Sequence, residues 1–160
     1  SGSFASGVTS GCYRSLVRIA HEAGAKVILD VRGEALRRSL EERPELVKIN
    51  MEEAGETFTG GSNGSSADWS GMMERMYQAY GTSMSITDGM RDIHYWSKGV
   101  PGTSPVVPVK DPVNLMGCGD AFAAGLLEGV LAGEPLEEAI PRAAACAARN
   151  AGSIRPGSLD

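Results

Sequence analysis

The 160-residue sequence lacks any apolar run near the roughly 20 residues that a membrane-spanning helix needs. It also lacks an excess of basic charge, because 15 Lys and Arg against 20 Asp and Glu give a net charge of −5. That balance disfavours binding to the phosphate backbone of a nucleic acid. Residues 1–4 do not resemble the basic and apolar start of a secretory signal. We therefore expect a cytoplasmic protein with neither nucleic acid nor membrane as a partner.

Cysteine is also scarce, with three residues at wide spacing: Cys12, Cys118 and Cys146. No two of them have the two-residue gap of a zinc or redox motif, which excludes those sites and fits a reducing compartment. Glycine, by contrast, is abundant, with 21 residues. Glycine concentrates where chains turn and where the backbone approaches a ligand.

Apolar periodicity predicts an alternation of helices and short buried strands. The expected helices cover residues 12–23, 34–42, 52–58, 69–80, 120–131 and 136–150. The expected strands cover residues 26–30, 46–49 and 83–87, with an antiparallel extension at 90–96 and 106–109 around Lys98 and Gly99. Such alternation predicts a single α/β domain over residues 1–160 with a largely parallel sheet.

Ligands of parallel sheets bind beyond the carboxyl ends of the strands. Asp30, Asn50 and Asp88 follow the expected strands directly and so should lie at that edge. Another candidate is the segment from Asn114 to Gly125, in which two close glycines precede a helix. Glycines there let backbone N–H groups turn toward a ligand, and the helix start adds partial positive charge.

Asp120 follows Gly117 and Gly119 directly and so would lie beside a bound anion. A carboxylate in that place can take a proton from a nucleophile. An ordinary helix N-cap gives the same pattern, and spacing alone leaves both interpretations open. The segment is not a Walker loop, because no Gly-Lys-Ser/Thr follows, and it is not a dinucleotide fingerprint.

Gly117-Cys118-Gly119-Asp120, followed by Ala-Phe-Ala-Ala-Gly, resembles the C-terminal signature of the PfkB, ribokinase-like sugar kinases. Further segments are similar to that family in the same order: residues 1–8, 27–36, 48–53, 85–89 and 147–151. Residues 48–53 resemble the family's Lys-Pro-Asn-x-x-Glu, with Ile49 in place of Pro. Asn114 and residues 33–36 point to the hexose-phosphate kinase branch, which includes 1-phosphofructokinase and tagatose-6-phosphate kinase.

The resemblance implies a three-layer αβα fold and ATP-dependent phosphorylation of a sugar or sugar-phosphate hydroxyl. Asp120 would be the general base, and the backbone N–H groups of Gly117, Cys118 and Gly119 would form an anion hole. Asn50 and Glu53 would organise Mg²⁺. The implied nucleotide-binding residues are Lys48, Ser85, Thr87, Gly89 and Asn150. For Lys48 a solvated strand-end lysine, and for Asn150 a helix C-cap, remain open.

Family members have about twice this length. The resemblance therefore implies that the chain is the C-terminal, nucleotide-binding and base-carrying part of such a kinase. The N-terminal half, with most sugar contacts and a lid, would be absent, which should expose an apolar sheet edge. That half or a second copy of the chain would be a partner. Two alternatives follow from the same absence: a non-catalytic ATP-binding fragment, or an interaction module that lacks the sugar site.

Overall fold

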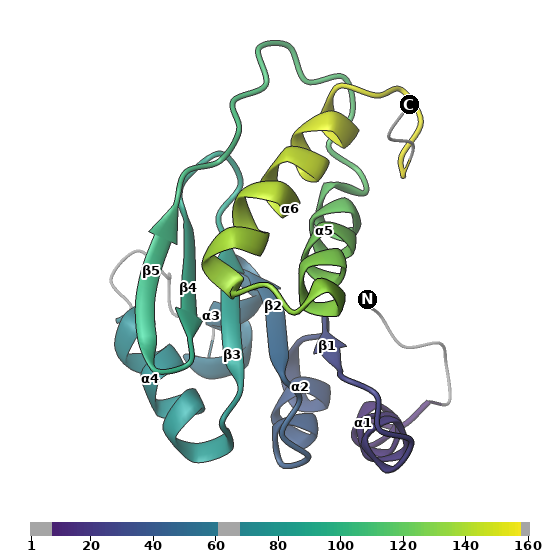
Figure 1. Ribbon diagram of the computed structural model, residues 1–160, viewed down its shortest axis with the longest axis vertical. Helices are drawn as coiled ribbons and strands as arrows, with labels where there is room; N and C mark the ends of the chain where they lie inside the picture. The colour runs from purple at the N-terminus through teal and green to yellow at the C-terminus, as the bar shows by residue number, and fades with distance from the viewer. Residues whose placement is uncertain (1–7, 61–67, 158–160) are drawn as a thin grey trace. The chain divides into compact units, whose positions relative to one another are not determined.

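A computed structural model describes residues 8–60 and 68–157 of the chain. It contains a five-stranded sheet in the order β1-β2-β3-β4-β5. The strands are β1 (Ile28–Leu29), β2 (Leu46–Asn50), β3 (Ser83–Thr87), β4 (Ile93–Ser97) and β5 (Val100–Ser104). β1, β2 and β3 are parallel, and β4 runs antiparallel to β3 (Figure 1). The α/β class with a mostly parallel sheet is therefore confirmed.

The chain divides into two compact units. The first comprises the described residues up to Gly89 together with His94–Gly102, and the second comprises Met90–Ile93 and the described residues from Thr103 onward. The helices of the first unit are α1 (Cys12–Glu22), α2 (Gly33–Leu40), α3 (Met51–Phe58) and α4 (Trp69–Tyr80). Those of the second are α5 (Cys118–Ala132) and α6 (Leu136–Ala151).

The sheet of the first unit has one apolar face. Leu29, Val47, Met84 and Trp96 are paired across the four strands β1 to β4 and so project from the same side. All four belong to one buried cluster that also contains residues of α1 to α4. The four helices therefore pack on this face, and residues one position along each strand project from the other.

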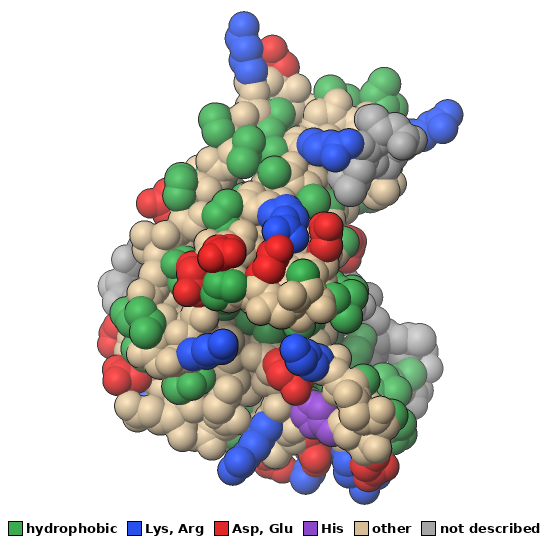
Figure 2. All heavy atoms as spheres, viewed as in Figure 1, with side chains coloured by type: hydrophobic (Ala, Val, Ile, Leu, Met, Phe, Trp, Pro, Cys, Tyr) green, Lys and Arg blue, Asp and Glu red, His purple; other side chains and the backbone are tan. Residues whose placement is uncertain are grey.

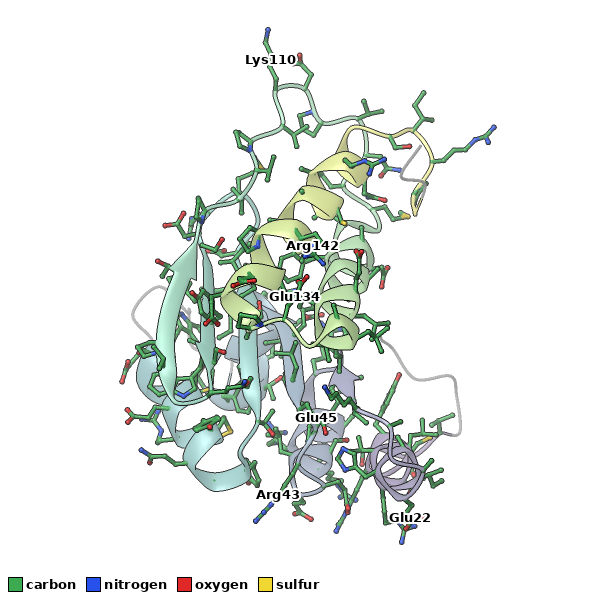
Figure 3. The ribbon with its side chains drawn as sticks, in the orientation of Figure 1. Glu22, Arg43, Glu45, Lys110, Glu134 and Arg142 are labelled. Carbon is green, nitrogen blue, oxygen red and sulfur yellow. The ribbon has the colours of Figure 1, made fainter. Side chains whose placement is uncertain are left out.

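Two glycines allow α5 and α6 of the second unit to pack closely. A Cβ atom at Gly125 would lie 2.6 Å from the Cα of Ala143, and one at Gly129 would overlap the side chain of Ala139. The guanidinium of Arg142 donates to both carboxylate oxygens of Glu134, at 2.6 and 2.7 Å, between α6 and the turn that precedes it (Figure 3). That hydrogen bond raises the pKa of Arg142 above its ordinary value.

The structure contains the expected antiparallel extension, but the predicted range of its second strand is wrong. The turn at Lys98 and Gly99 is confirmed, with β4 before it and β5 after it. Residues 106–109 are not a strand, because a two-residue turn requires pairing to start at once, at Val100. Pro105 and Pro108 also remove N–H donors that a strand there would need.

Surface charge is mixed on the face that Figure 2 shows, with acidic and basic side chains interspersed. Independently of that view, Glu34 on α2 accepts hydrogen bonds from Arg38 (2.7 Å) and Arg37 (3.2 Å), and these bonds hold the pKa of Glu34 below its ordinary value. Within the described part of the chain, no helix combines the length and the apolar character needed to cross a bilayer.

Candidate active site

The start of α5 is left without a side-chain cap. Its N-cap is Gly117, whose φ of 81° lies in the left-handed region, and the Gly117 position supplies no side-chain cap for the N–H groups of this helix. The helix begins at Cys118, two residues earlier than predicted, because glycine at the N-cap turns the chain before Asp120 is reached. In the first turn, the N–H groups of Gly119 and Asp120 have no backbone partner among the described residues, as is usual at a helix N-terminus.

Asp120 occupies the third position of this helix and is exposed to solvent. It is not the N-cap, so the N-cap interpretation of the Gly-Cys-Gly-Asp pattern is wrong. A carboxylate in the first turn is held by the positive end of the helix and remains open to a ligand. The N–H of Cys118 donates to Leu115 O at 3.3 Å, so this one of the three predicted anion-hole donors already has a partner.

The segment that leads into α5, residues 113–117, is here called the entry loop. Its N–H groups at Val113 and Asn114 donate to Ala151 O, at 2.8 and 3.2 Å. The Asn114 side chain accepts from Met116 N at 2.9 Å, which closes a local turn. The entry loop is thus bound to the end of α6 and braced internally.

Asn150 lies in the last turn of α6 and is fully buried, with 0% of its surface exposed. Its side chain donates to Met116 O at 2.8 Å. The C-cap of α6 is Gly152, so the alternative that Asn150 caps this helix is wrong. The predicted group in the second unit therefore consists of Gly117, Cys118, Gly119 and Asp120, with Asn150 packed behind the entry loop.

The remaining predicted residues lie in the first unit. Asn50 is the N-cap of α3: its Oδ1 accepts from Glu53 N (2.8 Å), and Glu53 Oε2 accepts from Asn50 N (3.2 Å). This is a capping box, in which each residue satisfies a backbone donor of the other. The pair predicted to organise a metal therefore also starts α3 at the carboxyl end of β2.

Lys48 is buried, with 5% of its surface exposed, and its Nζ lies 3.1 Å from Asp30 Oδ2. The solvated strand-end interpretation of this lysine is wrong. Its neighbour on β3 is Ser85, which projects from the same face of the sheet. The Ser85 hydroxyl is fully buried and has no hydrogen-bond partner among the described residues. Lys48 on β2 and Ser85 on β3 thus project from the face opposite the apolar cluster, and Asp30, just after β1, pairs with Lys48 there.

Thr87 pairs with Asn50 in the sheet register, so these two predicted residues are neighbours at the carboxyl ends of β2 and β3. Gly89 follows in a turn, is exposed and has a φ of 59°. The first unit therefore brings together Lys48 with Ser85 and Asn50 with Thr87. The segment at residues 1–7 that resembled the family lies outside the described residues.

Comparison with known protein families assigns the chain to one of them. Residues 1–158 match the pfkB family of carbohydrate kinases. The chain belongs to this family. Among pfkB proteins with curated names, it is 31% identical over 162 residues to a 1-phosphofructokinase of Rhodobacter capsulatus, covering 97% of this chain and 48% of the relative. It is also 31% identical over 140 residues to a 1-phosphofructokinase of Bacillus subtilis, covering 86% of this chain and 45% of the relative.

Solved structures of pfkB kinases share the fold. Phosphofructokinase-2 of Escherichia coli, in a potassium complex, superimposes with a TM-score of 0.85 at 20% identity, over 96% of this chain and 50% of that protein. Ribokinase of Arabidopsis thaliana, with ribose and ATP, gives 0.77 at 20% identity, over 92% of this chain and 48% of that protein. The ribokinase-like fold is therefore confirmed, and the chain spans about half the length of these relatives.

Two contacts made by the predicted site residues were not predicted from the sequence. Asp30 was placed at the sheet edge but not paired with Lys48. Thr57, buried in α3, donates to Glu53 O (2.6 Å) and accepts from Gly33 N (2.8 Å), so it joins the start of α2 to the capping-box residue. Only the four-residue spacing from Glu53 to Thr57 within one helix hints at the first of these bonds.

Proposed function

We propose that this chain is the nucleotide-binding and base-carrying part of an ATP-dependent kinase that phosphorylates a hydroxyl of a sugar or sugar phosphate. The observation that carries the proposal is the start of α5, where an exposed Asp120 stands beside N–H groups that no side chain caps. The pfkB family and the two relatives named 1-phosphofructokinase support fructose 1-phosphate as the acceptor to test first. Tagatose 6-phosphate is the second acceptor.

In this proposal Asp120 accepts the proton of the attacking hydroxyl as its oxygen forms a bond to the γ-phosphorus of ATP. The bond between that phosphorus and the β–γ bridging oxygen breaks, and ADP leaves with this oxygen. Backbone N–H groups at Gly117 and Gly119, with the positive end of α5, stabilise charge on the transferred group. Cys118 contributes less than predicted, because its N–H already donates to Leu115 O.

In the first unit we propose that Lys48, Ser85, Thr87 and Gly89 face the nucleotide. Lys48 is held by Asp30 and cannot swing freely into solvent, so it would act as a fixed positive charge near the phosphates. The unpartnered hydroxyl of Ser85 is a donor and acceptor that a bound ligand or water would satisfy.

Mg²⁺ is part of the proposal, and the residues present fit a site in which one carboxylate holds the ion together with water and the substrate phosphates. No group of three or more His, Cys, Asp or Glu side chains capable of holding a metal occurs in residues 8–60 and 68–157. Mg²⁺ commonly keeps several waters and binds through one or two carboxylates plus substrate phosphates. Glu53, oriented by its capping box with Asn50, is the carboxylate suited to this role. When bound, Mg²⁺ would neutralise charge on the phosphates.

The decisive test replaces Asp120 by Asn and measures ADP release with ATP and fructose 1-phosphate. We expect kcat to fall by roughly 10²–10⁴-fold, the usual contribution of a positioned base, while stabilisation by ATP persists. Glu137→Gln is the matched control, since Glu137 is an exposed carboxylate in the first turn of α6. It should leave kcat unchanged.

Full turnover in Asp120→Asn would refute the assignment of the base. Thermal stabilisation by ATP in a protein that phosphorylates neither sugar phosphate would favour a non-catalytic nucleotide-binding module. Partnership with an N-terminal half or a second copy of the chain, and a cytoplasmic location, belong to the same proposal. Of the solved relatives, phosphofructokinase-2 of Escherichia coli is described in a tetrameric inhibited form.

A further inference from the structure

The side chain of Asn150 joins three segments of the second unit. Its Nδ2 donates to Met116 O (2.8 Å) and to Cys118 Sγ (3.3 Å), and its Oδ1 accepts from Gly157 N (2.7 Å). A carbonyl on one side and an N–H on the other leave only one orientation of the amide that satisfies both. The end of α6, the entry loop and the turn at residue 157 therefore meet at one amide.

The backbone of Gly117 passes directly over this amide. A Cβ atom at Gly117 would lie 3.4 Å from Asn150 Oδ1 and 3.3 Å from Pro156 Cβ. Gly117, the N-cap of α5, thus lies against Asn150 and against the turn that contains Pro156. Asn150 is completely buried, whereas Met116 and Gly157 are exposed residues, so loss of the amide would remove the bonds that tie these two surface residues to α6.

We propose that Asn150 is a positioning residue that fixes the start of α5 for phosphoryl transfer, acting through Met116 and Gly117 rather than by touching the nucleotide. The proposal rests on the proposed function and revises the nucleotide-binding role that the family resemblance implied for Asn150. It leads to a specific expectation: loss of the amide harms the transfer step and does so regardless of which base the nucleotide carries.

The first test measures amide hydrogen exchange of residues 113–117 in two variants. Asn150→Asp keeps the acceptor for Gly157 N but sets a carboxylate oxygen against Met116 O, and Asn150→Leu removes both polar groups. Gln78→Ala is the matched control, because it removes an exposed amide near the end of α4 whose Nε2 donates to the Glu74 side chain (3.1 Å). We expect exchange to rise by about tenfold or more in both Asn150 variants and not in the control. Unchanged exchange would overturn the proposal.

The second test compares kinetics with ATP and with GTP in Asn150→Asp. We expect kcat to fall on the order of 10–100-fold with each nucleotide, while KM for ATP changes by less than about threefold, since loosened oxyanion donors act mainly on the transition state. A rise in KM for ATP alone, with GTP turnover unaffected, would show that Asn150 contacts the base and would overturn the proposal. A wild-type protein without transferase activity would count against the proposed function, and the exchange experiment would still decide the role of Asn150.

If neither variant folds, the wild-type protein still provides a test. Gly157 lies outside any helix or strand, yet its N–H is bonded to the buried Oδ1 of Asn150. We expect this N–H to exchange at least about a hundredfold more slowly than an unstructured amide. Exchange at the unprotected rate would contradict the proposal.

Discussion

At the scale of single residues, Gly117 and Gly133 form a natural pair for experiment. Gly117 before α5 has a φ of 81°, and Gly133 after α5 has a φ of 74°, both in the left-handed region. A Cβ atom at Gly133 would meet nothing within 4 Å, whereas one at Gly117 would press on Pro156 and Asn150. The two glycines share a backbone conformation and differ in what surrounds them.

We expect Gly133→Ala to lower the free energy of unfolding by about 1–2 kcal/mol, the usual penalty for a Cβ in this conformation. Gly117→Ala should incur this penalty and also shift the entry loop. At ATP concentrations of about 100 times Kd, the wild type and Gly133→Ala should each gain roughly 2.7 kcal/mol, and Gly117→Ala should lose most of that gain. Thermal unfolding with and without ATP measures both effects. Equal stabilisation by ATP in the two variants would argue against a nucleotide site at the start of α5.

Residue-scale prediction from the sequence succeeded where the signal was local. Gly117, Gly119 and Asp120 lie within four positions, so spacing predicted a helix start there, although the helix begins at Cys118 and not at Asp120. Asn150 bonds Met116, 34 positions away, and Lys48 pairs with Asp30, 18 positions away. Such pairings depend on tertiary packing, which a single sequence does not reveal.

At the scale of elements, the close contact between α5 and α6 depends on glycine at position 125, which has no side chain. Gly125→Ala would set a Cβ 2.6 Å from the Cα of Ala143, and backbone cannot yield as a flexible side chain can. Overpacking of this kind costs about 1–3 kcal/mol, partly offset by up to about 1 kcal/mol of better helix propensity. We expect a net loss of stability in urea unfolding followed by circular dichroism at 222 nm.

The control for that substitution is Gly152→Ala. Gly152 is the C-cap of α6, with a φ of −82°, and a Cβ there would come no closer than 3.6 Å to Arg149 O. Alanine should be neutral or slightly stabilising at this position. A Gly125→Ala protein as stable as Gly152→Ala would show that the two helices are not packed at Gly125.

Elements with strong periodic signals were predicted well, and the exceptions have identifiable causes. β2 and β3 match their expected ranges to within one residue, because each has buried apolar residues at alternate positions: Val47 and Ile49 on β2, and Met84 and Ile86 on β3. β5 was missed because Val100–Ser104 includes Pro101 and Gly102, which have poor strand propensity, and pairing through the Lys98–Gly99 turn overrides it. The family resemblance implied a metal role for Asn50 and Glu53, and the structure shows that their three-residue spacing also forms a capping box.

At the scale of the whole molecule, the two compact units carry different optical probes. The sequence has two tryptophans, Trp69 and Trp96, and both belong to the buried cluster of the first unit. Tryptophan fluorescence therefore reports on the first unit alone, while circular dichroism reports on helices of both. We expect Gly125→Ala to lower the circular dichroism midpoint in urea and to leave the fluorescence midpoint in place, because distinct units can open separately. Equal shifts of the two midpoints would show instead that the protein unfolds as one cooperative body.

The bond from Gly157 to Asn150 also matters for how the protein is handled in the laboratory. A protease cut just before Gly157, or a purification tag spliced in there, would take away one partner of the amide on which the start of α5 rests. Such a change would disturb the start of α5, and with it the position of Asp120, without altering any residue of that helix. The quality of a preparation altered at residue 157 should therefore be measured by its catalytic turnover and not by its yield.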